Sequence, residues 1–314
     1  MGFTAFRGMK PFQQLIFSVF VIIVSFLIFL IVSSLVAIPV FGLNAILNIP
    51  TINDLNDPES LRILKYFQVI QSIGLFIIPP FILGWLFHGD IPDYLKLNKK
   101  VTTLSILLVI MLTVSSQPFI NFIGEWNSRM HFPERLGGME SWMKNAEENA
   151  ALLTEAFLDV ETFSGLLFNL FMIAFLPAIG EELLFRGVIQ RIFTNWTNNY
   201  HWGIWISAIL FSALHIQFYG FVPRMLLGVI FGYLLVWGGS IWLPAVAHFI
   251  NNAAAVTAMY MIDKKMLNPA VEDIGSTRES YYLAAVSLVL ILLIMWMIKQ
   301  AKDKSRSGMA SAGS

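Results

Sequence analysis

Long apolar stretches recur along the whole chain and are separated by short polar segments. A helix needs about 20 apolar residues to cross a hydrocarbon core of roughly 30 Å. We therefore expect an all-α fold, with residues 1–314 forming a single membrane domain built as a polytopic helical bundle. The apolar stretches predict about eight transmembrane helices, over residues 14–39, 68–88, 103–124, 163–185, 202–220, 222–238, 241–262 and 281–298.

Two segments outside these spans have patterns of their own. Residues 125–162 form a long polar loop, and part of it, residues 138–160, has apolar residues at helical spacing with glutamates between them. This pattern predicts an amphipathic helix lying against the bundle or the membrane interface. Residues 300–314 end in a stretch rich in Ser, Gly and Ala, which is typical of a disordered tail. The apolar positions of the amphipathic segment are Trp142, Met143, Ala146, Leu153 and Phe157.

Composition agrees with a membrane protein. Hydrophobic residues make up 57% of the chain and charged residues 13%, and the mean hydropathy is +0.70. The formal net charge is zero, and no predicted soluble region carries a cluster of Lys and Arg large enough to bind a duplex, so we expect no nucleic-acid partner. The chain has no cysteine, which excludes disulfides, thiolate nucleophiles and Cys-based zinc sites. The expected partners are the lipid bilayer and molecules anchored in it.

The distribution of Lys and Arg predicts the orientation. With eight spans both termini lie on one side, and a mild majority of the basic residues in the loops falls on that side, because Arg224, Lys264, Lys265 and Arg278 fall on the other. The opposite side receives the acid-rich loop 125–162. We therefore predict cytoplasmic termini and an extracytoplasmic loop. The basic residues on the predicted cytoplasmic side are Arg7, Lys10, Lys96, Lys99, Lys100, Arg191, Lys299, Lys302, Lys304 and Arg306.

Two adjacent glutamates mark the fourth span as the place for chemistry. Glu181 and Glu182 follow an uncharged stretch, residues 164–180, and a charge at bilayer depth costs roughly 2.5–3.5 kcal/mol. Glu182 and Arg186 are four residues apart, so they share one helix face and can pair. Glu181 is rotated by about 100° from Glu182, so one arginine cannot easily serve both carboxylates. Glu181 is therefore the candidate for a chemical role.

Further polar residues lie on neighbouring spans. His215 follows Phe211 in an apolar run, and the polar turn 194–201 separates His215 from Glu181 by similar lengths of chain, so both should lie at similar depth. His248 and Asn252 share one face of the seventh span. A carboxylate near a neutral histidine can hold a water molecule and take its proton. A histidine N–H and an asparagine amide can donate to an oxyanion. The set predicts a hydrolase without a Ser or Cys nucleophile.

Other uses of the same residues remain open. Two histidines and a glutamate match a catalytic zinc site of the His₂Glu type, although the HExxH spacing is absent and the ligands would come from three spans. The polar residues could instead hold helices together in a non-catalytic scaffold. They could also relay protons in a transporter, but the sequence has no apparent inverted repeat.

Three features concern packing near the glutamates. Pro177 frees the carbonyl four residues back and could open the backbone close to Glu181. Gly228 and Gly232 form a small-xxx-small pair that lets helices approach closely. Ser207 and Ser212, on the fifth span, are interpreted as packing or backbone-bonded residues rather than nucleophiles.

Three motifs in this order resemble a known family. Residues 181–187 read EExxxR, residues 211–215 read FxxxH and residues 248–252 read HxxxN. The chain is similar in these motifs to the CAAX protease and bacteriocin-processing (Abi) family of intramembrane glutamate proteases, which includes the type II CAAX prenyl endopeptidases. The resemblance covers roughly residues 163–262, which would be the catalytic core helices.

The resemblance implies a role for each motif residue. Glu181 would activate water with help from His215, while His248 and Asn252 would form the oxyanion hole. Glu182 and Arg186 would be architectural, Phe211 would shape the cavity, and no metal or other cofactor would be needed.

The resemblance also implies a substrate class and a location. The best-known members cleave isoprenylated proteins near the C-terminus, so the expected substrate is a membrane-anchored peptide or protein. The expected location is a bacterial cell (inner) membrane. The alternative within the family is a bacteriocin-immunity protein without catalysis.

Overall fold

The computed structural model describes residues 6–312, and all regular secondary structure in this part is helical. The all-α prediction is therefore confirmed. Within these residues, seven helices are long and apolar enough to cross a membrane. They are α1 (Pro11–Phe41), Pro58–Phe87, α6 (Thr103–Ser128), Phe163–Thr197, α12 (Phe221–Gly238), α13 (Trp242–Asp263) and the Tyr281–Lys302 part of α14 (Tyr281–Ala312).

Two of the spanning helices are continuous but change their winding. Pro58–Phe87 consists of α3 (Pro58–Ser72), the π-helix η2 (Ile73–Ile77) and α4 (Ile78–Phe87). Phe163–Thr197 consists of α8 (Phe163–Asn169), the π-helix η4 (Leu170–Phe175), α9 (Leu176–Glu181), the π-helix η5 (Glu182–Ile189) and α10 (Gln190–Thr197). Wider turns of this kind inside an α-helix are frequent at functional sites. Glu182 is the first residue of the π-helix η5. The short helices are α2 (Leu43–Leu47), η1 (Ile52–Asp54), α5 (Ile91–Tyr94), η3 (Glu134–Leu136) and η6 (Pro269–Val271).

The predicted span 202–220 is shorter than expected. Helix α11 (Tyr200–Ala213) has 14 residues, a length of about 21 Å, which is less than a bilayer core. It ends in a turn, residues 214–220, in which Ile216 has a left-handed φ of 55°. The hydroxyl of Ser212 donates to the carbonyl of Phe221 at 2.6 Å and fixes this turn to the start of α12. His215 therefore lies in a turn within the bundle rather than on a spanning helix.

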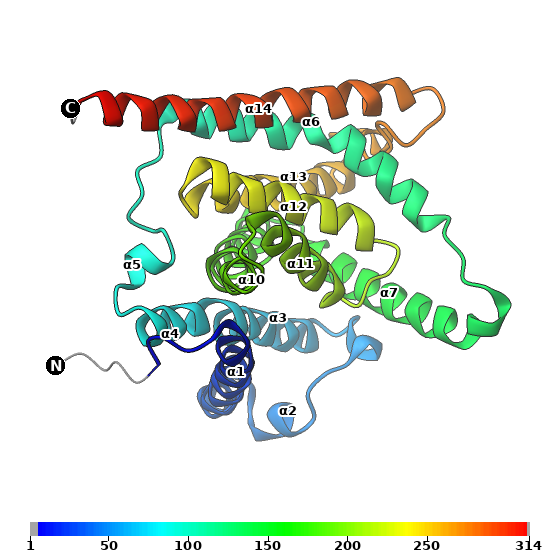
Figure 1. The fold of residues 1–314 in the computed structure, drawn as a ribbon. Helices are drawn as coiled ribbons and strands as arrows, with labels where there is room; N and C mark the ends of the chain where they lie inside the picture. Colours follow the sequence, from blue (N-terminus) through cyan, green and yellow to red (C-terminus); the bar gives the residue numbers. More distant parts are fainter. Residues whose placement is uncertain (1–5, 313–314) are drawn as a thin grey trace.

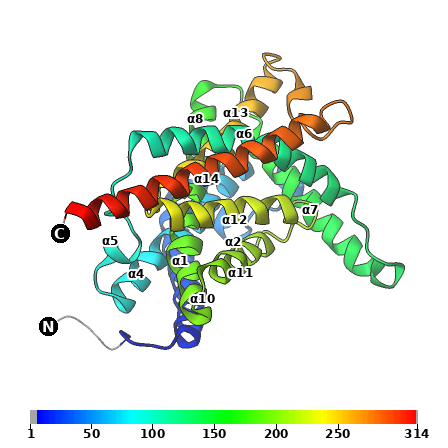
Figure 2. The same cartoon turned by 45° about the horizontal axis from the view of Figure 1, so that its top comes forward.

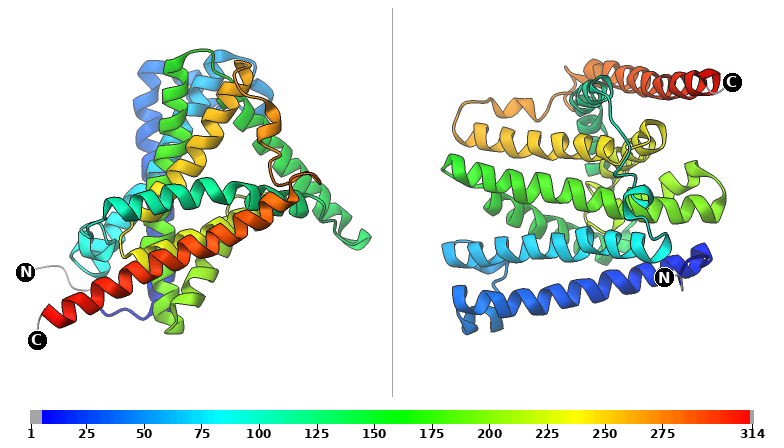
Figure 3. Two further views of the ribbon diagram at one scale, coloured as in Figure 1. Left: turned by 90° about the horizontal axis from the view of Figure 1, so that it is seen from above. Right: turned by 90° about the vertical axis from the view of Figure 1, so that its left-hand side faces the viewer.

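The spanning helices form two groups that cross each other. In Figure 1, α14 lies along α6 at one edge, followed by α12 and α13, then α10 and α11, then α3 and α4, with α1 at the opposite edge. In Figures 2 and 3, α1, the Phe163–Thr197 helix and α13 run in one direction, and α6, α12 and α14 cross them. Glu181 and Glu182 lie on the Phe163–Thr197 helix, which we call the central helix.

One end of the bundle carries the start of α1, the segment 88–102, the turn after α10, the turn after α12 and the last turns of α14 (Figure 3). We call it the terminal end. Its segments are tied together: the indole N–H of Trp242 donates to the carbonyl of Leu97 at 3.0 Å, and the Ser240 hydroxyl donates to the carbonyl of Lys99 at 3.2 Å. Both ends of the described chain thus lie on one side of the bundle, and the assignment of that side to the cytoplasm stays a prediction.

Helix α7 (Gly137–Leu158) occupies the expected amphipathic segment and lies against the bundle. Its Glu147 carboxylate accepts the backbone N–H of Tyr219 at 2.8 Å, and the Lys65 ammonium donates to the carbonyl of Phe157 at 2.9 Å. At the other end of the sequence, the backbone of α14 is helical to Ala312, which differs from the expected tail over residues 300–314. Its Lys, Ala and Met residues are good helix formers that extend a spanning helix; residues 313–314 lie outside the described part.

Gly228 and Gly232 let α12 approach its neighbours, as the small-xxx-small pattern predicts. A Cβ at Gly232 would lie 2.8 Å from both Gln190 Oε1 and Ile204 Cγ2. A Cβ at Gly228 would lie 3.1 Å from the Cβ of Ala208. The central helix and α11 therefore contact the backbone of α12 at these two positions.

Alanine at Gly232 is expected to destabilise the protein by about 1–3 kcal/mol, because the added methyl group overpacks the contact with Gln190 and Ile204. Unfolding by sodium dodecyl sulfate, followed by circular dichroism, measures the change. Gly138→Ala in α7 is the matched control, because nothing lies within 4 Å of a Cβ at that position. Equal stability of the two variants would contradict a tight α12 contact.

Candidate active site

Glu182 is completely buried and has two partners. Its Oε1 lies 2.9 Å from Nη1 of Arg186 and 2.8 Å from Nδ1 of His248. The side chains of Glu182 and Arg186 are 0% and 1% exposed. The ion pair expected from the four-residue spacing is present, and the contact with His248 adds a partner that the spacing did not indicate.

Aromatic rings and a backbone carbonyl hold Arg186 in the bundle. Its Nη2 donates to the carbonyl of Gly228 at 3.2 Å. The guanidinium lies 4.7 Å from the ring centroid of Phe211 and 5.5 Å from that of Phe231. Such contacts of a cation with ring faces are favourable, more so where water is excluded. The Nη1 group contacts Glu182 as an ion pair without the alignment of a hydrogen bond.

His248 lies between the two glutamates. Its Nε2 is 3.8 Å from Oε2 of Glu181, on the opposite side of the ring from Glu182. The ring stacks on Phe231 with centroids 5.3 Å apart, and the ring of Phe211 meets it edge-on at 6.1 Å. Because an ionised carboxylate only accepts hydrogen bonds, we assign a proton to Nδ1. The other ring nitrogen then faces Glu181.

The two glutamates differ in access. The side chain of Glu181 is 12% exposed, whereas that of Glu182 is 0% exposed. Oε1 of Glu182 contacts both Arg186 and His248, and Oε2 is buried without a hydrogen-bond partner among the described residues. Glu181 keeps an accessible carboxylate beside a histidine nitrogen, an arrangement that can hold a water molecule.

Asn252 lies next to the proline kink of the central helix. Its Nδ2 donates to the carbonyl of Ile173 at 3.2 Å, and its Oδ1 accepts from Asn251 at 3.2 Å. Ile173 is four residues before Pro177, so its carbonyl is the one that loses an α-helical partner. The carbonyl of Ile173 thus accepts a hydrogen bond from the side-chain amide of Asn252 on α13. The second N–H of this amide remains available as a donor.

His215 is exposed and is oriented by a backbone carbonyl. Its Nδ1 lies 2.9 Å from the carbonyl of Phe211, and the two rings are 5.1 Å apart. A carbonyl can only accept, so Nδ1 carries the proton and Nε2 of the neutral ring keeps its lone pair. Between residues 6 and 312 no direct hydrogen bond or ion pair joins His215 to Glu181. Phe211 connects the two histidines, because its ring contacts both.

The central helices match a known protein family. Residues 163–254 match the family described as type II CAAX prenyl endopeptidase Rce1-like. This segment is similar to Rce1-like domains. The resemblance to this protease family is therefore confirmed, and the matched segment contains Glu181, His215, His248 and Asn252.

A curated relative matches over a similar length. The chain is 30% identical over 89 residues to the uncharacterized protein YpbD of Bacillus subtilis (strain 168), which is 27% of this chain and 42% of YpbD. The match thus covers about two fifths of the length of that relative. No solved structure matches the chain.

Arg224 is a charged neighbour of the candidate site, and the sequence analysis counts it only among the basic residues of the outer side. It lies in the first turn of α12, and its Nη2 donates to Oε1 of Gln217 at 2.6 Å. It interacts electrostatically with Glu181 and with Glu147 of α7. The signal that marks it in the sequence is a single arginine in an otherwise uncharged span, 222–238.

The two serines of α11 are bonded to the backbone, as interpreted from the sequence. The hydroxyl of Ser207 donates to the carbonyl of Phe185 at 2.9 Å, within the π-helix that follows Glu181. Ser212 donates to the carbonyl of Phe221. Both therefore serve the packing of the Rce1-like segment.

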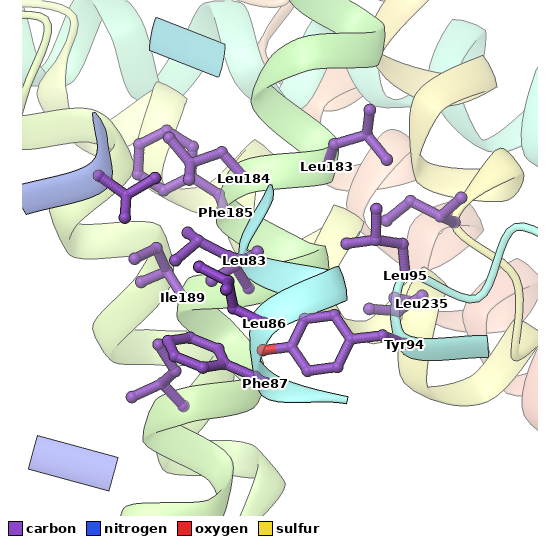
Figure 4. Close-up of a cluster of buried hydrophobic side chains, with 14 of the residues drawn as sticks. Leu83, Leu86, Phe87, Tyr94, Leu95, Leu183, Leu184, Phe185, Ile189 and Leu235 are labelled. Atoms are coloured by element: carbon purple, nitrogen blue, oxygen red, sulfur yellow. The ribbon is translucent and has the colours of Figure 1, made fainter. Parts of the chain in front are cut away.

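Packed apolar side chains fix the π-helix that carries Glu182. Leu184, Phe185 and Ile189 pack with α4, as Figure 4 shows. This buried cluster continues into the segment after α5 and to the end of α12. A densely packed support of this kind restricts the motion of the side chains it carries. The other labelled members of the cluster are Leu83, Leu86, Phe87, Tyr94, Leu95, Leu183 and Leu235.

The zinc alternative requires three ligands in one place. In the part of the chain that the structure describes, no group of three or more His, Cys, Asp or Glu side chains is arranged to hold a metal ion. Glu181 and His248 are neighbours, and the ring of Phe211 contacts both His248 and His215. Zinc dependence therefore stays a hypothesis for a chelator experiment.

Proposed function

We propose that the protein is an intramembrane endopeptidase that hydrolyses a peptide bond near the C-terminus of a membrane-anchored protein or peptide. The observation that carries this proposal is the accessible carboxylate of Glu181, 3.8 Å from Nε2 of His248, inside the segment similar to Rce1-like domains. A peptidase needs a base for water and donors for an oxyanion, and this site has groups of both kinds.

In the proposed mechanism Glu181 is the general base. Its carboxylate takes a proton from a water molecule while the water oxygen attacks the scissile carbonyl carbon. His215 assists, because Nε2 of its neutral ring can accept a hydrogen bond from the same water molecule. The proton held by Glu181 is then transferred to the leaving amine, which completes hydrolysis without a covalent intermediate.

His248 and Asn252 supply the donors for the oxyanion. Glu182 accepts a hydrogen bond from Nδ1–H of His248 and orients the ring, so that Nε2, when it carries a proton, can donate to the developing negative charge. The formal charges of Glu181, Glu182, Arg186 and the protonated His248 sum to zero, which lowers the cost of placing them in a membrane. The free N–H of Asn252 is the second donor. Glu182 and Arg186 act as positioning residues.

The proposed substrate is anchored in the bilayer. The site lies on helices that span the membrane, so a substrate delivered laterally from lipid would reach it with its cleavage site already at membrane depth. The family description names CAAX prenyl endopeptidases, and a prenylated C-terminus is accordingly the first substrate to test. The proposal needs no metal and no organic cofactor.

A comparison of cell membranes tests this proposal. Cells producing the wild type, Glu181→Gln or the exposed control Glu161→Gln are compared by C-terminal proteomics, with and without a chelator. We expect shortened C-termini with the wild type and the control that disappear with Glu181→Gln.

The other outcomes separate the alternatives. Loss of these fragments on chelation would favour the zinc enzyme. Identical proteomes in all three strains would contradict the peptidase and favour the scaffold or immunity protein. Ion or proton flux in liposomes without any cleavage would favour the transporter.

A further inference from the structure

A cavity of about 420 Å³ opens at the terminal end of the bundle, and Glu181 is not among its lining residues. The segment 93–99, the central helix, the start of α11, the end of α12 and Lys302 of α14 line it. On the central helix its lining runs from Arg186 to Thr194, a rise of about 12 Å. Its volume is in the range of sites for small ligands, roughly 300–1,000 Å³.

The lining is strongly basic. Five cationic side chains and one carboxylate line the cavity, and one of the cations, Arg186, is paired with Glu182, so the formal charge including this partner is +3 (five minus two). The ammonium of Lys99 pairs with Asp93 at 2.9 Å and holds the pKa of that carboxyl below its ordinary value. Asp93 therefore cancels one positive charge and no more. The five cations are Lys96, Lys99, Arg186, Arg191 and Lys302.

The cavity walls are built before any ligand arrives. The Arg191 guanidinium donates to the carbonyl of Tyr94 at 2.7 Å and lies 4.2 Å from the centroid of its ring. Lys302 donates to the carbonyl of Val236. These contacts hold two cations, Arg191 of α10 and Lys302 of α14, beside one space through backbone carbonyls and a ring face. An anion with several oxygen acceptors fits such a set.

Exposed tryptophans place the cavity at the depth of lipid headgroups. Trp196, Trp202 and Trp242 are 45%, 60% and 41% exposed, and all three lie at the terminal end, where α10 ends and where α11 and α13 begin. Tryptophan is enriched at the interface between the hydrocarbon core and water. The phosphate layer of the bilayer would therefore meet the mouth of the cavity. Basic pockets between membrane helices are suited to anionic headgroups.

We propose that this basic cavity binds a phosphate group, carried by the headgroup of an anionic phospholipid. The size of the cavity accommodates a glycerol phosphate headgroup, and its charge favours lipids with net negative charge over zwitterionic ones. No step of the proposed peptidase enters this inference. A failure of the lipid site and a failure of the peptidase can therefore be told apart.

The test compares two double variants that remove the same charge from the same elements. Lys96→Gln/Lys302→Gln removes two lining cations, and Lys100→Gln/Lys299→Gln removes two neighbouring cations that do not line the cavity. Each protein is purified in mild detergent with phosphatidylglycerol or phosphatidylcholine added, and retained lipid is measured by native mass spectrometry. Thermal unfolding with and without inorganic phosphate is the second arm.

We expect the wild type to retain phosphatidylglycerol in preference to phosphatidylcholine. Each ammonium that is removed from the lining should weaken retention by about fivefold, so Lys96→Gln/Lys302→Gln should weaken it by about twenty-fivefold. The control variant Lys100→Gln/Lys299→Gln should weaken retention by less than about threefold. Stabilisation by inorganic phosphate with the same variant dependence, and no retained lipid, would support the phosphate site with a soluble source.

Equal lipid retention by both doubles, with no effect of phosphate, would overturn the proposal. If Lys96→Gln/Lys302→Gln fails to fold, the single variants Lys96→Gln and Lys100→Gln are compared in the same way. The expected difference is then about fivefold, and no difference between these single variants would again overturn the proposal.

Discussion

Glutamine in place of Glu181 is expected to lower kcat for a membrane-anchored reporter peptide by about 10²–10⁴-fold, the usual contribution of a general base. Glutamine keeps the shape of the side chain but cannot take a proton from water. KM should change by less than about twofold, because the carboxylate acts on water rather than on the bound peptide. Purified protein in liposomes, with the reporter in the same bilayer, gives both constants.

The control for this variant is Glu161→Gln, which removes an exposed carboxylate outside the spans. It should leave kcat and KM unchanged. Unfolding by sodium dodecyl sulfate should show Glu181→Gln to be as stable as the wild type, because among the described residues the ion-pair contact of Glu181 is the long one of 3.8 Å to His248. A raised KM at unchanged kcat would show instead that Glu181 binds substrate, and the base would have to be sought elsewhere.

The sequence predicts the local features of this site well. The pairing of Glu182 with Arg186 and the separate position of Glu181 follow from helical spacing alone, since both concern neighbours on one helix. The boundaries of most spans follow from hydropathy for the same reason. The freed carbonyl at Ile173 follows from the chemistry of Pro177, although its partner does not.

Contacts between helices are what the sequence does not specify. The bond from His248 to Glu182 depends on how α13 crosses the central helix. The end of the turn after α11 is joined to α7 by the bond from the Tyr219 N–H to Glu147, which also depends on contacts between elements. Arg224 was missed for the same reason: its nearness to Glu181 depends on that turn. The π-helix from Glu182 onward also changes the direction of side chains that ideal α-helical spacing would place.

Methionine in place of Arg186 is expected to cost about 3–5 kcal/mol of stability. Glu182 would then be left as a buried charge without its cation, which is the expensive way to break an ion pair. The aromatic contacts with Phe211 and Phe231 would also be lost. Unfolding by sodium dodecyl sulfate measures the loss, and the exposed Arg62→Met or Arg135→Met gives the control for removal of an arginine.

The double variant Glu182→Leu/Arg186→Met separates the two functions of Glu182. Removing both charges eliminates the unpaired buried carboxylate, so the double variant should be more stable than Arg186→Met alone. It should still lie about 1–3 kcal/mol below the wild type, because the Nδ1–H of His248 has lost its acceptor. Additive losses would show that Glu182 and Arg186 do not stabilise each other. A double variant with wild-type stability and full activity would show that His248 does not need Glu182, and the positioning role proposed for this glutamate would be wrong.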